Sequence, residues 1–233
     1  MGKTASERPG LKAVRVWDLP TRLFHWSLVL CFVGSIVSVK IGGNAMAWHL
    51  RFGYAVFALL AFRLLWGFVG GRWSRFASFL YSPATLLRYL RRQDRSEEHL
   101  DVGHTPLGSA SVFAMLLFLS AQVASGLFAD DEIATTGPLN KFVSSATGLL
   151  LTGYHKSIGQ WVLIGLVLLH VAAILIYRLR LRRDLIGPMI SGDKLLPSDI
   201  HASEDDQGTR ALAVMLVTVC AAVVAFLVTI VGG

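Results

Sequence analysis

The 233-residue chain is too apolar and too sparsely charged for a soluble globular domain. Hydrophobic residues make up 54% of it and charged residues only 16%, whereas a soluble domain carries about 25% charged residues. The 22 Lys and Arg outnumber the 15 Asp and Glu, giving a net charge of +7. These basic residues flank apolar runs and form no patch with interleaved aromatic residues. We therefore expect an integral membrane protein and no nucleic-acid partner.

Five apolar runs are long enough to cross a bilayer as helices. A spanning helix needs about 20 predominantly apolar residues, and the sequence contains five runs of that kind. The sequence therefore predicts an all-α integral membrane helical bundle. The five runs cover residues 19–41, 46–70, 107–129, 154–177 and 211–231.

The segments outside the runs predict few further elements. Asp18 and Pro20 suit the start of the first helix, as its cap and a first-turn residue. Residues 82–90 begin with Ser-Pro and mix Leu with Arg, so we expect a short helix lying in the membrane interface. Residues 184–210 contain Gly, Pro, Ser and acidic residues, a composition typical of a flexible linker.

Lys and Arg are concentrated on one side of the predicted spans. Seventeen of the 22 lie in the N-terminal residues up to Arg22, in the 71–106 loop and in the 178–210 loop. Only Lys40, Lys141 and Lys156 lie in loops or helix ends on the other side. The positive-inside rule then predicts a cytoplasmic N-terminal segment (1–18), a cytoplasmic linker (184–210) and a C-terminus outside.

Four of the seven histidines fall in or at the ends of the predicted spans. Ionisable residues at membrane depth are costly and usually mark a function. In the predicted orientation, His25 and His170 lie in the inner leaflet, whereas His49 and His155 lie in the outer leaflet. His155 and His170 are fifteen residues apart, which puts them on one helix face and about 22 Å apart. For any one of them alone, the alternative is a neutral imidazole bonded to a neighbouring helix.

The four histidines sort into two pairs, His25 with His170 and His49 with His155. The two side chains of each pair come from different helices, as ligation of a planar macrocycle from both faces requires. Two imidazoles on opposite sides of an iron make a low-spin haem suited to electron transfer, so the pattern predicts two haem irons. Structural zinc is the competing metal, but it collects four ligands in one cluster, and these four are divided between two depths.

Two arginines are candidate partners for haem propionates. Arg63 follows His49 by fourteen residues, which puts it near the same helix face and about 21 Å further in. A guanidinium at that depth can pair with the propionates of the inner haem. Arg22, three residues before His25, is the second candidate. For both arginines the alternative is snorkelling to the inner interface.

Other residues near the pairs are less specific. Gly53 and Gly159 each follow a histidine by four residues and would leave room for the edge of a flat ring, although helix packing is an equal alternative. The acidic residues 130–132 suit proton acceptance, docking of a basic cytochrome or a solvated loop. The remaining histidines lie in loops or at their borders: His99, His104 and His201.

Several motifs together resemble one known family. The segment 15–26 reads Arg-Val-Trp-Asp-Leu-Pro-Thr-Arg-Leu-Phe-His-Trp, and residues 48–54 read Trp-His-Leu-Arg-Phe-Gly-Tyr. Residues 103–108 read Gly-His-Thr-Pro-Leu-Gly, and the last motif is the spacing between His155 and His170. In this order they resemble bacterial cytochrome b561 and the cytochrome b subunits of nickel–iron hydrogenases, over roughly residues 14–190.

The resemblance implies a cofactor, a fold and partners. It implies a four-helix core (19–183) holding two haem b, with His25, His49, His155 and His170 as the iron ligands. It implies electron exchange between ubiquinone or menaquinone and a redox partner, either hydrogenase-like or a c-type cytochrome, in the lipid of a bacterial inner membrane. The fifth helix (211–233) lies outside the resemblance, and we expect it to serve packing or partner contact, with a homodimer left open.

Two further functions stay open at this point. One is a partner-independent quinol oxidoreductase acting on a small oxidant such as superoxide. The other is a haem-free transporter that uses the four histidines as a proton path. A transporter would favour Asp or Glu inside the spans, and four of the five runs contain neither: 19–41, 46–70, 154–177 and 211–231.

Overall fold

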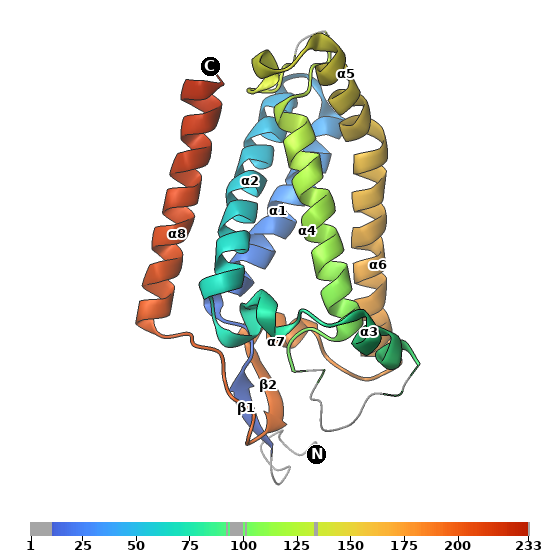
Figure 1. The fold of residues 1–233 in the computed structure, drawn as a ribbon, viewed down its shortest axis with the longest axis vertical. Coiled ribbons are helices and arrows are strands. Elements are labelled where there is room, and N and C mark those ends of the chain that lie inside the picture. The colour runs from blue at the N-terminus through green and yellow to red at the C-terminus, as the bar shows by residue number, and fades with distance from the viewer. Residues whose placement is uncertain (1–10, 92, 94–99, 101, 133–134, 233) are drawn as a thin grey trace. The chain divides into compact units, whose positions relative to one another are not determined.

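The computed structural model describes residues 11–91, 93, 100, 102–132 and 135–232. Within them, five helical runs are long and apolar enough to cross a membrane. The expected all-α membrane fold is thus confirmed (Figure 1). These runs are Leu19–Ile41, Gly43–Val69, Pro106–Leu127, Ser145–Leu179 and Gln207–Val231.

The elements follow one another along the chain as labelled in Figure 1. The α-helices are α1 (Leu19–Ile41), α2 (Met46–Val69), α3 (Pro83–Leu90), α4 (Pro106–Leu127), α5 (Ser145–Tyr154), α6 (Gln160–Leu179), α7 (Ile186–Ser191) and α8 (Gln207–Phe226). Two π-helical segments, His155–Gly159 and Leu227–Val231, adjoin α5 and α8. The described residues also form two strands, β1 (Leu11–Arg15) and β2 (Asp193–Pro197), and short 3-10 turns at Gly43–Ala45, Arg72–Ser74, Phe76–Ser78 and Asn140–Phe142.

The fourth spanning run begins nine residues earlier than the expected start at 154. Ser144 caps it, because its hydroxyl accepts a hydrogen bond from the Thr147 N–H at 3.2 Å. From there α5, the π segment and α6 continue without a break to Leu179. His155 therefore lies inside a long helix, and the expectation that it opens the helix is wrong.

The described residues divide into two compact units. The first unit draws on the described residues within 11–23, 65–110 and 173–213, and the second on those within 24–64, 111–172 and 214–232. All four histidines of the predicted pairs belong to the second unit.

The first unit contains a two-stranded antiparallel sheet and a small core. Strand β1 pairs with β2 so that Leu11 faces Pro197 and Arg15 faces Asp193. The core side chains are Val14, Val16, Trp17, Val102 and Ile200. The flexible linker expected over 184–210 is wrong, because this segment supplies α7, β2 and a core residue.

The buried carboxylate of Asp18 holds the start of α1 in the first unit. It accepts hydrogen bonds from the Thr21 N–H at 2.7 Å, the Ser74 hydroxyl at 2.5 Å and the Trp66 indole N–H at 3.2 Å. Asp18 is fully buried, and a buried carboxylate needs such donors to offset its lost hydration. The expected cap is therefore confirmed.

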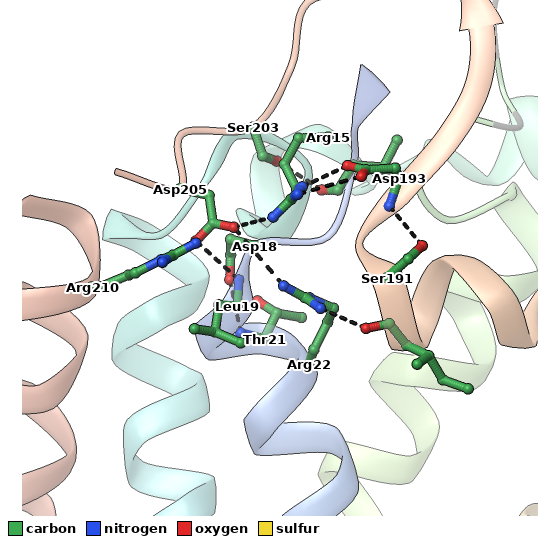
Figure 2. Close-up of polar contacts among 12 residues, drawn as sticks. Arg15, Asp18, Leu19, Thr21, Arg22, Ser191, Asp193, Ser203, Asp205 and Arg210 are labelled. Carbon is green, nitrogen blue, oxygen red and sulfur yellow. Dashed lines mark hydrogen bonds and ion pairs between the residues drawn. The ribbon is translucent and has the colours of Figure 1, made fainter. Parts of the chain in front are cut away.

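A second carboxylate, Asp205, joins three segments of the first unit (Figure 2). It accepts hydrogen bonds from Arg15 Nη1 at 2.5 Å, Arg210 Nε at 2.9 Å and the Leu19 N–H at 3.2 Å. Burial raises the pKa of Asp205, but these donors outweigh burial, so the pKa lies below its ordinary value. Arg15 also pairs with Asp193 at 2.6 Å.

The expected short helix at 82–90 is also present in the first unit. It is α3, and Ser82 caps it by accepting a hydrogen bond from the Thr85 N–H at 3.1 Å. Pro83 occupies the first turn, where a missing N–H costs no helical hydrogen bond.

The second unit packs four helices around one apolar core. Val56 and Leu60 of α2 meet Leu119 of α4 and Leu163 of α6. Side chains of α1 cover this cluster, including Leu28, Cys31 and Phe32. The fifth long helix, α8, supplies no residue to the cluster among those described.

Candidate functional site

The rings of His49 and His155 lie next to each other, edge to face, in the second unit. Their ring centroids are 6.0 Å apart, and the two ring planes are nearly perpendicular at 85°. His49 lies in the first turn of α2, and His155 is the first residue of the π segment. The structure therefore brings together the two side chains that the sequence assigns to the outer pair.

Each of these two rings has its Nδ1 bound to the main chain of a neighbouring helix. His49 Nδ1 lies 3.1 Å from the Ser35 carbonyl oxygen and 3.1 Å from the Ser35 hydroxyl, both on α1. His155 Nδ1 lies 2.9 Å from the Gln122 carbonyl oxygen and 3.3 Å from the Ser125 hydroxyl, both on α4. A carbonyl oxygen only accepts, so each Nδ1 carries the proton. In the neutral ring, Nε2 then keeps its lone pair for a metal ion.

A cavity of about 330 Å³ adjoins this pair of rings. Its walls come from α1, α2, α4, α6 and the loop after α4. They are mainly apolar, as expected of a pocket that holds a hydrophobic cofactor. Two lysines also line it, Lys40 and Lys156.

Glycines make room at the two rings, although the two expected positions differ. A Cβ added to Gly53 meets no atom within 4 Å, so this residue borders open space in the cavity wall. A Cβ added to Gly159 would instead collide with the Gln122 and Tyr154 side chains. A Cβ at Gly126 would come within 2.8 Å of the His155 ring. Gly53 thus fits the interpretation of space for a flat ring, whereas Gly159 fits helix packing.

His25 and His170 are the second pair, and both also lie in the second unit. Both side chains are half-buried, His25 on α1 and His170 on α6. The buried Nδ1 of His25 has no hydrogen-bond partner among the residues that the structure describes. The carbonyl support seen at His49 and His155 is therefore not present at His25 among the described residues.

The two candidate arginines have different surroundings. Arg63 of α2 is buried in the second unit, with 3% of its surface exposed. Arg22 belongs to the first unit, where its Nη1 donates to the Ile190 carbonyl at 2.5 Å and its Nη2 lies 4.0 Å from Asp205 (Figure 2). The guanidinium of Arg22 is therefore engaged in the polar cluster of the first unit.

The other histidines take no part in either pair. His104 packs in the first unit between Trp17 and Phe79, with ring centroids 4.7 Å and 4.4 Å away. His201 is exposed. His99 lies outside the described residues.

The candidate metal-binding side chains do not form larger clusters among the described residues. Across the described part of the chain, no three His, Cys, Asp or Glu side chains converge as a metal site. A structural zinc ion needs four such ligands in one place. Two opposed imidazoles suit a macrocycle that supplies the other ligands of its own metal.

The separation of the His49 and His155 rings would allow both to hold one metal ion. A metal–imidazole bond is about 2 Å long, and the centre of the ring lies about 1 Å beyond the bonded nitrogen. Two rings bound to the same metal ion from opposite sides would thus have centroids about 6 Å apart. The observed separation is 6.0 Å. Carbonyl acceptors on both Nδ1 atoms are the usual supports of metal-ligating histidines.

Comparison with known families identifies the group to which this arrangement belongs. Residues 16–192 match the family model of prokaryotic cytochrome b561. The chain belongs to the prokaryotic cytochrome b561 family. As a member, it is a multi-pass membrane cytochrome of the b type, and such a cytochrome holds haem b and transfers electrons.

Several relatives of this cytochrome b561 family member are named as probable hydrogenase subunits. It is 25% identical to a probable Ni/Fe-hydrogenase B-type cytochrome subunit of Bradyrhizobium diazoefficiens, over 83% of this chain and 89% of that one. It is 26% identical to the probable subunit of Cupriavidus necator, over 82% and 90%. It is 22% identical to the probable hydrogenase 1 subunit of Escherichia coli K12, over 76% and 88%. No solved structure matches the chain.

Sequence reasoning missed the residues that support the rings. Ser35, Gln122 and Ser125 carry no motif, and two of the four contacts use main-chain carbonyls, which every residue has. Lys40 was assigned only to a loop or helix end, yet it lines the cavity. A polar residue in an apolar span, such as Gln122, is the one signal that could have pointed to this role.

Proposed function

We propose that this protein is a di-haem b-type cytochrome that carries electrons across the cytoplasmic membrane. Its electrons would pass between the quinone pool and a partner redox protein. The observation that carries this proposal is the opposition of the His49 and His155 rings, with each Nδ1 held by a main-chain carbonyl. Such an arrangement leaves the Nε2 lone pair of each ring available to a metal ion.

In this proposal His49 and His155 hold the iron of the outer haem. The bound haem supplies one-electron redox chemistry, and its ligands and surroundings set its potential. The chain's own contribution is a mainly apolar cavity, the open space at Gly53 and the two supported rings. Lys40 and Lys156 in the cavity wall offer positive charge to propionates.

His25 and His170 hold the iron of the inner haem in the same proposal. Both rings are half-buried in the second unit, and they come from different helices, His25 from α1 and His170 from α6, as ligation of one haem from both faces requires. Arg63 is the proposed cation for the inner propionates, since a buried guanidinium favours an anion nearby. Arg22 stays a second candidate, although its Nη atoms already contact Ile190 and Asp205.

The proposed orientation in the membrane follows from the distribution of Lys and Arg between the loops. With Lys and Arg concentrated in the N-terminal residues and in the 71–106 and 178–210 loops, the N-terminus lies in the cytoplasm of a bacterium. The di-haem domain then comprises residues 19–183. The fifth helix (211–233) serves packing or partner contact.

A hydrogenase-like protein is the proposed redox partner, because the relatives reported above are named as hydrogenase cytochrome subunits. A c-type cytochrome is the alternative partner, and ubiquinone or menaquinone is the proposed small-molecule partner. A protein of this kind that oxidised quinol without any partner would instead be a self-sufficient oxidoreductase. Quinol turnover by the purified protein alone distinguishes that function.

The first experiment is a reduced-minus-oxidised spectrum of the purified protein in detergent, combined with a haem-to-protein ratio. We expect two haem b per chain. A ratio of one would overturn the di-haem proposal. No haem in folded protein would overturn the cytochrome function altogether.

A further inference from the structure

Gln122 of α4 and His155 are joined by two reciprocal hydrogen bonds. The Gln122 carbonyl oxygen accepts from His155 Nδ1 at 2.9 Å. The Gln122 side-chain Nε2 donates to the His155 carbonyl oxygen, also at 2.9 Å. One residue therefore holds both the ring and the main chain of the proposed iron ligand.

The main chain at His155 is where such support is needed. His155 opens the π segment His155–Gly159, between α5 and α6. A π turn interrupts the regular α-helical hydrogen bonding, and π turns within helices occur frequently at functional sites. A hydrogen-bond donor from a neighbouring helix can satisfy a carbonyl oxygen that lacks a regular hydrogen bond within its own helix.

One face of α4 is shaped around this contact. Gln122, Ser125 and Gly126 are spaced three and four residues apart, so they lie on the same side of the helix. A Cβ at Gly126 would press on the His155 ring at 2.8 Å, and a Cβ at Gly159 would overlap Gln122 Oε1. Both glycines therefore leave the space that the Gln122–His155 contact occupies.

The orientation of the Gln122 amide follows from its partner. The His155 carbonyl can only accept, so the amide must turn its NH₂ group toward it. The opposite atom, Oε1, is then buried and has no partner among the described residues. Leaving Oε1 unsatisfied costs free energy, which indicates that the amide is retained for its bond to His155.

We propose that Gln122 is a positioning residue that sets the rotation and electron-donating strength of His155, and through them the reduction potential of the outer haem. The inference rests on the proposed function, because it takes His155 as an iron ligand. A ring whose Nδ1–H bonds to a carbonyl is a more basic ligand. A more basic ligand stabilises the ferric iron and lowers the potential.

The test compares Gln122→Met with wild type and with Gln160→Met, using the full-length protein with its haems. Methionine is close to glutamine in length and flexibility but cannot donate to the His155 carbonyl. The main-chain carbonyl that accepts from His155 Nδ1 stays in the variant, so the substitution acts by releasing the main chain of His155, which lets the ring rotate and weakens the Nδ1–H bond. Gln160 also lines the cavity, and no hydrogen bond from its side chain to either histidine occurs among the described residues. It undergoes the same chemical change and serves as the matched control. Potentiometric titration and low-temperature electron paramagnetic resonance give the two readouts.

We expect Gln122→Met to raise the midpoint potential of one haem and to move the g values of that haem alone. The expected ratio of ferrous to ferric iron at fixed potential changes about tenfold, which is 59 mV for one electron. Gln160→Met changes the cavity wall but breaks no hydrogen bond to either histidine, so we expect its shift to be well below that of Gln122→Met. A shift of equal size in Gln160→Met, or no shift in Gln122→Met, would overturn the inference.

A second variant covers the case in which Gln122→Met is poorly folded. Gln122→Asn keeps the amide but shortens the side chain by one methylene, so it loses reach to the His155 carbonyl. We expect the same direction of shift, or loss of one haem while the other haem keeps its wild-type spectrum. Wild-type behaviour of Gln122→Asn would count against the inference. Failure of the proposed function is separate, since it would appear as missing bis-histidine signals in the wild-type protein itself.

Discussion

The imidazole of His49 stands edge-on to that of His155, with 85° between the ring planes and 6.0 Å between the centroids. This relationship holds because each ring is fixed independently, His49 by Ser35 of α1 and His155 by Gln122 of α4. If both rings hold one haem iron as proposed, their perpendicular planes would give the ferric haem a distinct electron paramagnetic resonance signal, so this spectroscopy tests the arrangement.

Removing one ring of this pair should remove one haem. We expect His49→Ala to lower the haem content from two per chain to one, with the spectrum of the remaining haem unchanged. The reason is that the proposed inner haem uses a different pair of ligands, His25 of α1 and His170 of α6. A haem-to-protein ratio and a difference spectrum measure this. Loss of both haems from a chain that still folds would contradict the two-pair arrangement.

Filling the open space at Gly53 should reduce haem binding without unfolding the helix. Gly53→Leu would project a side chain into the cavity wall, where an added Cβ meets no protein atom within 4 Å. We expect haem content to fall toward one per chain, while the helical circular dichroism stays at the wild-type level.

The matched control for that variant is Gly165→Leu. Gly165 of α6 also has no atom within 4 Å of an added Cβ, but it is not part of the cavity wall. We expect it to retain two haems. Equal haem loss in both variants would show that bulk on any helix, and not space at Gly53, controls binding.

Arg63 should affect the inner haem alone. Arg63→Leu removes a buried cation, and we expect a lower potential or loss of one haem, because positive charge near an iron favours its reduced form. Arg63→Lys keeps the charge and should retain most of the wild-type potential. Arg51→Leu is the control, because the Arg51 guanidinium lies over the Trp48 ring, 4.8 Å from its centroid. Redox titration of the three variants distinguishes them, and equal shifts in all three would contradict the role.

Asp205 should make the stability of the first unit dependent on pH. Its pKa is lowered on folding by hydrogen bonds from Arg210, Leu19 and Arg15, which outweigh its burial. A lowered pKa means that the stabilisation is fully present above the unfolded value of about 3.9 and is lost as pH falls through the folded value. We expect Asp205→Asn to lower the free energy of unfolding by about 2 kcal/mol at pH 7. The loss should be much smaller at a pH below the folded pKa of Asp205.

Thermal unfolding in detergent at pH 7 and at successively lower pH checks this prediction. The measured quantity is the difference in Tm between wild type and Asp205→Asn. Asp206→Asn is a suitable control, because Asp206 hydrogen-bonds locally to the Thr209 N–H. A Tm difference for Asp205→Asn that stays constant with pH would mean that its charge is not what stabilises the cluster.

Much of the fold was predictable from local sequence. The spans follow from apolar length, because a membrane helix must satisfy its backbone internally and cover about 30 Å. The caps of α1 and α3 follow from Asp18 and from Ser82 before Pro83, since a short polar side chain there accepts the first unpaired N–H groups. The histidines were conspicuous because ionisable side chains are rare at membrane depth.

Long-range contacts were not predictable in the same way. Strand β1 pairs with β2 although they are far apart in the sequence, with Leu11 opposite Pro197. The composition of neither segment identifies its partner. The fourth spanning helix starts at Ser145 because Ser144 caps it, and a π turn at His155 leaves no mark in residue composition.

The sequence by itself determined that this is a membrane protein of five apolar spans with four histidines at two depths. Only the tertiary structure decided how His49 and His155 meet and what holds each ring. The physical reason is that their supports are the carbonyl oxygens of Ser35 and Gln122. Main-chain acceptors are the same in every residue, so only the packing of α1 against α2 and of α4 against the π segment selects them.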